Sequence, residues 1–444
     1  MRASQDLSRI STRFDDPNLV SHAGLLAPVS LAQALGLADL VDTHLTMSGP
    51  GSANRGLKTL SVVGAMLAGG DSIEDVDVLR AGGNEALLGA ARAPSTIGTW
   101  LRRLDGGSVR QLDKVARLML VRAWAAGAGP AEKSAPATLD VDSSICQVYG
   151  PAKHGATFGY TKVRGYHPLL ATLAETGEVL HTRLRGGNAG TARGAGTFLA
   201  ETFSRVRDAG VTGQLTLRAD SGFYSRNVTA ACRIAGVLFS ITVRQNPSIA
   251  AAIAAIDDGA WTPIPYWSST AEASAADVAE TGYTAFAGTR EEVTARLVVR
   301  RTRPTEGSQL ALLVDWSYHA FLTDRAGELI AVEADHRRHA VVEQTIAALK
   351  DGGLAHLPSG RFGANSAWLI LAALAHNLSR ALGILAGHGF TTATPATVRR
   401  CLTAIPGRLA YRARRRHLHL PAHWPWRAAF DHALDAIRAL PAPG

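Results

Sequence analysis

The chain has 444 residues and a formal net charge of +9, so it is long enough for two or three domains and favours a polyanionic partner. Its three cysteines, Cys146, Cys232 and Cys401, form no C-x-x-C pair, which excludes a zinc ribbon and a disulfide framework and favours a reducing compartment. The N-terminus is polar, without the pattern of a signal peptide, and the longest strongly apolar run (367–375) is too short to span a bilayer. We therefore expect a soluble cytoplasmic protein.

The first 130 residues are expected to form an all-helical domain. Apolar residues at helical spacing predict helices, in chain order, at 29–41, 57–68, 72–79 and 84–91. After a short turn, residues 93–96 start a helix that continues through 97–104, where Trp100 lies near Arg102 and Arg103. This is the pattern of a helix-turn-helix recognition element, so the two arginines are candidates for DNA contact. The alternative is a solvated polar face.

A linker at 127–136 separates this region from a segment, 131–243, in which strands alternate with helices. We expect the following elements, in chain order: strands at 138–145, 159–171 and 178–185, a Gly-rich turn and a helix ending at Arg207, a strand at 215–219, a helix at 226–235 and a strand at 238–243. This β-β-β-α-β-α-β order resembles that of the RNase H-like fold, an α/β core with a mixed five-stranded sheet.

The rest of the chain departs from a minimal core of that kind. Residues 244–335 contain β-like runs at 295–302 and 315–323, so we interpret them as a β-rich insertion. Residues 336–390 are expected to complete the core with helices at 339–350 and 366–385. Residues 391–444 form a basic, aromatic tail that suits binding to a DNA backbone; the alternative is a solvated terminal segment.

Three acidic residues stand where two strands and one helix could bring them together. Asp142 lies in the first strand of the core segment, Asp220 directly follows the 215–219 strand, and Glu343 lies in the 339–350 helix. Carboxylates of this kind can hold two divalent cations, which clamp the attacking and leaving oxygens in phosphoryl transfer. Oxygen ligands favour Mg²⁺.

Each acid also has a purely structural interpretation. Asp140 lies two residues before Asp142, on the same strand face, and either could be a strand-end cap. Asp220 could be a turn residue before Ser221 and Gly222, and Glu343 an ordinary helix carboxylate paired with a nearby cation. The combination of the three acids favours a functional site.

Basic side chains near these positions are candidate phosphate contacts. Lys350 lies two turns after Glu343 on the same helix face. Lys162 and Arg164, with Tyr166 and His167, lie beside the second expected strand, where they could contact a phosphate backbone or form the solvent face of a hairpin.

The motifs around these acids are similar to those of a known family. Asp142-Ser-Ser, Arg218-Ala-Asp-Ser-Gly-Phe-Tyr-Ser225 and His336-Arg-Arg-His-Ala-Val-Val-Glu-Gln-Thr-Ile-Ala-Ala-Leu-Lys350 resemble the DDE transposases of bacterial insertion sequences, and insertion-sequence family 1380 in particular. The resemblance extends from the helical N-terminal region through Leu385. It implies an RNase H-like catalytic domain, two Mg²⁺ or Mn²⁺ ions, terminal inverted repeats and target DNA as partners, and cut-and-paste transposition by a homodimer in a synaptic complex.

Carried over residue by residue, the resemblance makes Asp142, Asp220 and Glu343 the catalytic, metal-binding triad. Lys350 matches the lysine that follows the glutamate in relatives. Relatives often have a tyrosine at the position of His336 and an arginine at the position of His339, and this pair binds the 5′ phosphate. Arg338 is the candidate replacement for that contact. Trp316 is a candidate for stacking on a flipped base, with a core strand aromatic as the alternative.

Two other functions compete with a transposase. An RNase H-like nuclease or resolvase would cut without strand transfer, but it would not need the helical N-terminal region and the long insertion. A DNA-binding protein without catalysis, such as an inactive or domesticated transposase, would not need the intact set of acids. A metabolic enzyme is disfavoured because the chain has no G-x-G-x-x-G after a strand, no P-loop and no nucleophile elbow.

Overall fold

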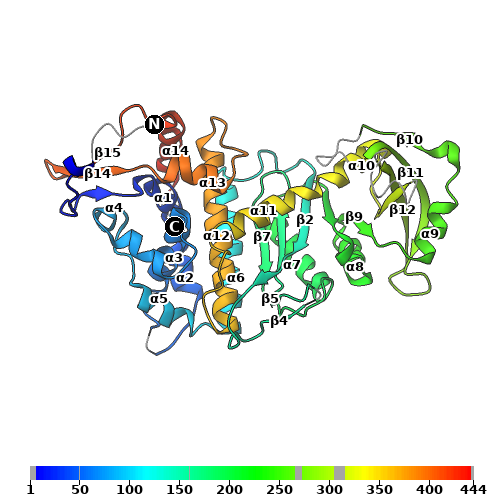
Figure 1. The fold of residues 1–444 in the computed structure, drawn as a ribbon, viewed down its shortest axis with the longest axis horizontal. Coiled ribbons are helices and arrows are strands. Elements are labelled where there is room, and N and C mark those ends of the chain that lie inside the picture. The colour runs from blue at the N-terminus through cyan, green and yellow to red at the C-terminus, as the bar shows by residue number, and fades with distance from the viewer. Residues whose placement is uncertain (1–6, 50, 160, 266–272, 305–315, 442–444) are drawn as a thin grey trace.

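The computed structural model describes residues 7–49, 51–159, 161–265, 273–304 and 316–441. A body of helices forms one end of an elongated molecule, and a long sheet extends from it to the other end (Figure 1). The helices are α1 Leu26–Ala34, α2 Leu37–His44, α3 Arg55–Ala68, α4 Asn84–Leu88, α5 Pro94–Leu101, α6 Gly106–Ala125, α7 Ala195–Asp208, α8 Arg226–Ala235, α9 Pro247–Ala254, α10 Leu329–Arg337, α11 Val341–Lys350, α12 Phe362–Ala386, α13 Pro395–Val398 and α14 Arg427–Arg438. The strands are β1 Leu19–Val20, β2 Ala137–Ser143, β3 Cys146–Gln147, β4 Thr157–Phe158, β5 Arg164–Tyr166, β6 Leu169–Leu173, β7 Val179–Arg183, β8 Leu215–Ala219, β9 Leu238–Val243, β10 Thr262–Pro263, β11 Ala273–Ala285, β12 Val293–Pro304, β13 Ser317–Thr323, β14 Gly407–Arg412 and β15 Arg415–His419.

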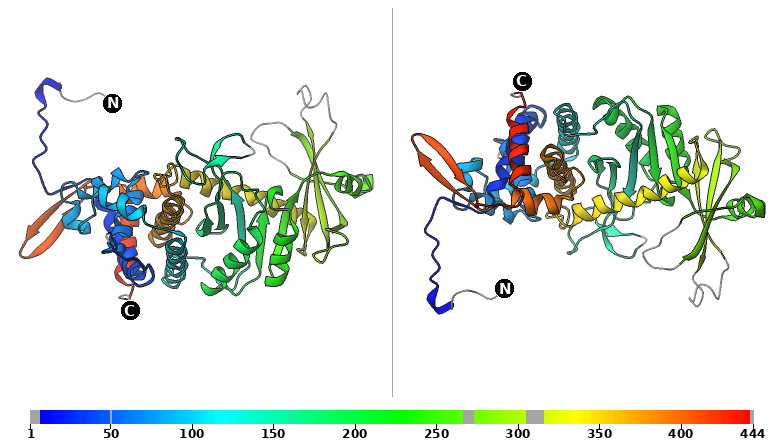
Figure 2. Two further views of the ribbon diagram at one scale, coloured as in Figure 1. Left: turned by 90° about the horizontal axis from the view of Figure 1, so that it is seen from below. Right: turned by 90° about the horizontal axis from the view of Figure 1, so that it is seen from above.

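A mixed nine-stranded sheet is the centre of the fold. Its strand order is β10-β11-β12-β13-β9-β8-β2-β6-β7. β2, β8 and β9 pair in parallel, and the remaining pairs are antiparallel. Helices α7 and α8 cover one face, while α10 and α11 cross the other (Figure 2). β2, which carries Asp142, therefore lies inside the sheet with helices on both of its faces.

The expected insertion does not form a separate sheet. β13 pairs antiparallel with β9, and β12, β11 and β10 add beyond it, so these strands continue the central sheet. The expected run at 295–302 lies within β12, and the run at 315–323 corresponds to β13, except that residue 315 lies outside the described residues. α9 and α10 were not expected in this segment.

The strand expected at 159–171 is wrong as a single element. Residue 160 lies outside the described part of the chain, and the rest divides into β5 and β6 on either side of His167 and Pro168. Proline has no N–H to donate to a strand ladder, so the chain changes partners at this point. β5 pairs with β3 and β4 in a small three-stranded sheet, whereas β6 joins the central sheet.

The helix expected at 29–41 is likewise two helices, α1 and α2. Gly36 lies between them with φ of 72°, a left-handed backbone that glycine adopts without the steric cost of a Cβ atom. The helix expected to start at 93–96 begins at Pro94, a favoured residue in a first helical turn, but it ends at Leu101 and not at Leu104.

Helices from both ends of the chain share one hydrophobic core. Side chains of α1–α3, α5 and α6 pack in the same cluster as those of α12 and α14. The N-terminal region is also not purely helical among its described residues, because β1 pairs with β14 near the other end of the chain. The two ends of the sequence thus build a single structural unit (Figure 1).

α12 is the central helix of this body. By length and hydropathy it is one of the segments that could cross a membrane, as is the bent pair 23–34 and 37–44 if it counts as one span. However, 83% of the most apolar window of α12 is buried inside the structure. The helix expected at 366–385 is therefore present as a buried core helix.

Candidate active site

Asp142 and Asp220 lie at the ends of two neighbouring parallel strands. β2 and β8 pair so that Val141 is opposite Ala219; Asp142 is the next residue in β2, and Asp220 directly follows β8. Because the carboxyl ends of parallel strands meet at one edge of a sheet, the pairing brings both carboxylates to the same edge.

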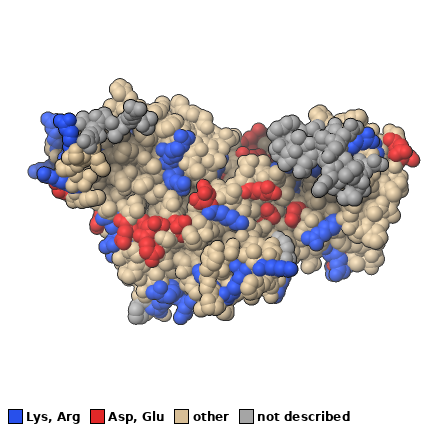
Figure 3. Space-filling model, viewed as in Figure 1, with Lys and Arg blue, Asp and Glu red and all other residues tan. Residues whose placement is uncertain are grey.

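Glu343 approaches this edge from a helix. It is an exposed residue in the first turn of α11, and α11 packs against β2. Acidic side chains gather on the face of the molecule over β2 and the adjoining part of α11, with basic side chains beside them (Figure 3).

The three carboxylates are close enough to interact electrostatically. Burial raises the pKa of the half-buried Asp142 to about 6, and the negative charges of Asp220 and Glu343 contribute to the same shift. The hydrogen bond from the Ser143 N–H and the charge of His339 oppose it. A carboxyl group near like charges favours its protonated form unless a cation is present.

Both aspartates are fixed by backbone donors. The Ser143 N–H donates to Oδ1 of Asp142 at 2.6 Å, and the Gly222 N–H donates to Oδ1 of Asp220 at 2.9 Å. The hydrogen bond from Gly222 closes the turn that the sequence predicted as the structural alternative for Asp220. It occupies one carboxylate oxygen and leaves the other for a further ligand.

The donors suit a hard divalent cation in kind and in charge. Carboxylate oxygens are preferred ligands of Mg²⁺ and Mn²⁺, and a cation would relieve the repulsion that raises the pKa of Asp142. In the described part of the chain, no three side chains of His, Cys, Asp or Glu are gathered in an arrangement that could hold a metal ion.

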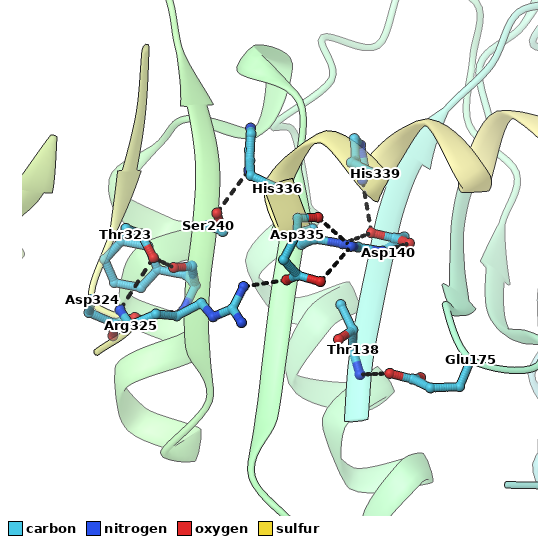
Figure 4. A network of polar contacts seen from close by, with 12 residues as sticks. Thr138, Asp140, Glu175, Ser240, Thr323, Asp324, Arg325, Asp335, His336 and His339 are labelled. Atoms are coloured by element: carbon cyan, nitrogen blue, oxygen red, sulfur yellow. Dashed lines mark hydrogen bonds and ion pairs between the residues drawn. The ribbon is translucent and has the colours of Figure 1, made fainter. Parts of the chain in front are cut away.

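Asp140, the alternative to Asp142, is committed to a buried ion-pair network (Figure 4). Its two oxygens accept hydrogen bonds of 2.8 Å each from Nε and Nη2 of Arg218, and Nδ1 of His339 lies 2.9 Å from Oδ1. Arg218 also contacts Asp335, which in turn pairs with Arg325. Since these partners use both of its carboxylate oxygens, Asp140 is less available to a metal ion than Asp142.

His336 belongs to the interior of the sheet face. Its ring nitrogens lie 2.8 Å from Oγ of Ser240 and 3.0 Å from Oγ1 of Thr242, and its ring stacks on Phe321 with centroids 3.9 Å apart. Burial, assisted by nearby positive charges, lowers its pKa to about 3. The imidazole is therefore neutral at pH 7 and holds α10 on the sheet, so it does not replace a phosphate-binding tyrosine.

Comparison with known proteins assigns the chain to a family. The family model described as "Transposase DDE domain group 1" matches residues 3–442. The chain belongs to the DDE transposase family. No curated protein matches the chain. Among solved structures, it is similar to a piggyBac transposase in a synaptic complex with hairpin DNA, with 12% sequence identity and a TM-score of 0.44, over 86% of this chain and 78% of that one.

Lys350 and Arg338 flank Glu343 on the transposase surface. Lys350 is the exposed last residue of α11. Burial raises the pKa of the Cys146 thiol to about 11, and the positive charge of Lys350 opposes that shift. Lys350 therefore lies beside the segment that follows Asp142. Arg338 is exposed in the short 3-10 helix Arg338–Ala340, before Glu343.

Arg164 lies in β5 of the small three-stranded sheet, and Lys162 lies just before that strand. Nε of Arg164 donates to the Ala156 carbonyl at 3.3 Å and Nη2 to that of Pro151 at 2.6 Å, and Nη1 donates to the Gly150 carbonyl. This guanidinium holds a loop together, which weakens its candidacy as a phosphate ligand. Lys162 is exposed in a turn with φ of 58°.

Arg102 and Arg103 lie outside the helix that was expected to present them. They follow the last residue of α5, and Trp100, expected beside them on a recognition surface, is fully buried. Arg102 is exposed, with Nη2 3.3 Å from Oγ1 of Thr99, whereas Arg103 donates to the Ser48 carbonyl at 2.5 Å. The two residues form a short surface turn between α5 and α6.

Trp316 is half-buried beside β12, where cations already cover it. The guanidinium groups of Arg301 and Arg303 lie 4.2 and 4.7 Å from its ring centre, and Arg301 also stacks on Trp261 at 4.2 Å. The structure thus places Trp316 in an arginine–tryptophan stack rather than in a hydrophobic core.

The roles of two residues around the site were not recognised from the sequence. His167, weighed as a phosphate contact or as part of the solvent face of a hairpin, is buried, with Nε2 2.9 Å from Oγ of Ser143 and Nδ1 2.8 Å from the Ala189 carbonyl. Arg185 donates to the carbonyls of Gly190, Thr191 and Arg193 in the loop that follows β7. Together they tie this Gly-rich loop to the residue after Asp142. No local sequence signal would have found these partners.

Proposed function

We propose that this DDE transposase belongs to a bacterial insertion sequence of family 1380. It binds the terminal inverted repeats of its element and catalyses metal-dependent strand cleavage and strand transfer. Asp142, Asp220 and Glu343 are its catalytic and metal-binding residues. The observation that carries the proposal is the convergence of two adjacent parallel strand ends and the α11 helix, with the charges of Asp220 and Glu343 raising the pKa of Asp142.

We assign β7-β6-β2-β8-β9 to an RNase H-like core. Three antiparallel strands followed by two parallel additions, with α7 and α8 between the later strands, support this assignment. The proposed division is a DNA-binding region at 1–130, core segments at 131–243 and 336–390, the insertion at 244–335 and the basic tail at 391–444. We expect the enzyme to work in the bacterial cytoplasm, on the nucleoid when bound to DNA.

Two Mg²⁺ or Mn²⁺ ions held by the three carboxylates would activate water or a DNA 3′-hydroxyl and stabilise the leaving oxygen. The protein's own contribution is position: Ser143 and Gly222 orient the two aspartates through their N–H groups, and α11 carries Glu343 to the same edge. Lys350 and Arg338 supply positive charge on either side, where a phosphate backbone would lie.

The partners of this site are the element's two ends and a target duplex. Two ends must be held together for strand transfer, so we propose a homodimer in the synaptic complex. Arg102, Lys162 and Trp316 remain candidate DNA contacts by exposure or stacking, while Arg103 and Arg164 have structural hydrogen bonds.

The test is cleavage of DNA that carries the element's inverted repeats, in the presence of Mg²⁺. Wild type should cut at the repeat boundary, and Asp142→Asn, Asp220→Asn and Glu343→Gln should each lower the rate by at least about a hundredfold while they retain end binding. Asp351→Asn is the matched control, because this exposed carboxylate directly follows α11 and should leave cleavage unchanged.

Retained cutting by any one of the three variants would remove that residue from the site. Binding without cutting by the wild type would instead favour a non-catalytic DNA-binding protein. Asp140→Asn should behave differently from all three: it leaves the buried charge of Arg218 without its main partner, so it should lower thermal stability as well as activity.

A further inference from the structure

A basic hairpin at the end of the helical body has no role in the site described above. It consists of β14 and β15 with their connecting turn, residues 407–419, and it projects from the molecule beside the N-terminal helices (Figures 1 and 2). It contains no acidic residue, and it carries the following basic ones: Arg408, Arg412, Arg414, Arg415, Arg416, His417 and His419. Basic side chains mark this end of the molecule (Figure 3).

The base of the basic hairpin is built into the protein. Leu409 is 1% exposed and packs with Val20 and Ala23, β14 pairs with β1, and Arg408 lies 3.1 Å from Asp16 in an ion pair. A hairpin anchored in this way is a fixed element of the fold, so the position of its tip is defined.

The tip, by contrast, is exposed. Arg412, Arg414 and Arg415 are all solvent-accessible, and none of them forms an ion pair with the residues that the structure describes. Arg416 donates to the Ala86 carbonyl at 2.7 Å and lies over the Tyr411 ring, so it belongs to the anchored part. The positive charge of the tip therefore faces outward.

Two features of the tip oppose its own stability. Arg412 and Arg415 are directly opposite each other in the strand register, and like charges in that position destabilise a strand pair. The connecting residues Ala413 and Arg414 have φ of 50° and 63°, a left-handed conformation that two-residue hairpin turns usually assign to Asn and Gly. Alternating charges and an Asn-Gly turn would give a more stable hairpin, which points to a partner for the tip.

We propose that the basic hairpin is an arm that binds the phosphate backbone of duplex DNA, an inference that rests on the proposed function. Phosphates on the arm would neutralise the repulsion between Arg412 and Arg415. A two-stranded ribbon also fits the major groove of a duplex, and the arm stands on the body that contains the proposed DNA-binding helices. It would thus extend the DNA-binding surface away from the carboxylate site.

The test uses the full-length protein and a fluorescent duplex of arbitrary sequence, about 30 base pairs long, titrated at several salt concentrations. The variant is Arg412→Gln, Arg414→Gln and Arg415→Gln combined. The control removes three exposed arginines outside the proposed DNA-binding region and the basic tail: Arg207→Gln, Arg233→Gln and Arg290→Gln combined. Each lost phosphate contact should reduce the slope of log affinity against log salt by about 0.9, so the tip variant should lose roughly two to three units of slope and the control none.

The outcomes separate this inference from the proposed function. Equal slopes for the tip variant and the wild type, with both still binding DNA and cutting element ends, would overturn the arm alone. No duplex binding by the wild type would overturn the arm and the transposase function together. The melting temperature of the tip variant should be unchanged or higher, because the Arg412–Arg415 repulsion is gone; a large decrease combined with an unchanged slope would assign these arginines to stability and refute the arm.

Discussion

At the residue scale, the choice of Asp142 over Asp140 as the proposed catalytic aspartate rests on a partner far away in sequence. Asp140 and Asp142 lie on the same strand face, so the strand pattern alone could not choose between them. Arg218, which is 78 positions from Asp140 in the sequence, favours Asp142 because it binds both oxygens of Asp140. The pairing of β2 with β8 brings the two together. Local patterns found the acids, but only the tertiary pairing distinguishes a ligand from an ion-pair residue.

The raised pKa of Asp142 predicts a measurable cost of ionisation in metal-free protein. Its pKa is about 6 in the folded chain, against 3.8 as its ordinary value. Between these values the folded state binds more protons than the unfolded state, so the contribution of this group to stability decreases as pH rises from about 4 to 6 and stays low above that. The full difference is at most about 3 kcal/mol.

Asp142→Asn removes this titration. In buffer with EDTA at pH 8 the variant should unfold at a higher denaturant concentration than wild type, and the difference should disappear as pH falls to about 4. Added Mg²⁺ should stabilise wild type more than the variant. Chemical denaturation at several pH values measures both effects. A stability difference that does not change with pH would contradict the raised pKa.

At the element scale, the sequence predicted a helix or strand well where its bounds depend on the local pattern of apolar residues. β8, α8 and β9 have the bounds expected from their apolar patterns. The predictions failed where one residue redirects the chain, at Gly36 and Pro168, and where an element depends on distant contacts. The basic hairpin is an example: its base is held by β1, nearly four hundred positions earlier, and no pattern in 391–444 could show that.

The Gly-rich loop after β7 offers an element-scale prediction. A Cβ atom at Gly187 would lie 2.2 Å from the carbonyl oxygens of both Gly165 and Thr157, so the loop can pack on the small sheet only with glycine there. Gly187→Ala should destabilise the protein by roughly 1–3 kcal/mol and lower cleavage, because this loop also carries the carbonyl that holds His167.

Gly190→Ala is the matched control for that variant. A Cβ atom at Gly190 meets nothing within 4 Å, so this change in the same loop should leave the melting temperature and cleavage close to those of wild type. Equal melting temperatures for the two variants would show that the loop is not packed as described.

At the scale of the whole molecule, the central sheet and the helical body depend on different kinds of information. The order of strands and helices in 131–243 predicted the centre of the sheet. The helical body could not be predicted in the same way, since α1 packs against both α12 and α14. Such contacts depend on the apolar faces of helices hundreds of residues apart, which separate sequence windows cannot match to each other.

The shared core of the helical body predicts that damage to α14 should loosen the N-terminal helices. Phe430 is 3% exposed within that core, and Phe430→Ala should cost about 3–5 kcal/mol. Hydrogen exchange should become faster in α1 as well as in α14. Ile234→Ala, at a position 87% exposed on α8, is the control and should leave exchange in α1 unchanged. Faster exchange in α14 alone would show that the two ends fold independently.

The shared core also determines when the helical body can fold during the protein's synthesis. α1 cannot complete its packing until α14, the last described helix, has left the ribosome. At about 5–20 residues per second, the apolar surfaces of the first helices stay uncovered for roughly 20–80 s. During that interval the nascent chain already contains the strands that bear both aspartates, yet the body next to them is unfinished. Newly made enzyme should therefore need chaperones most in its N-terminal part, and a premature stop codon before or within α14 should yield an aggregating chain rather than a partly active one.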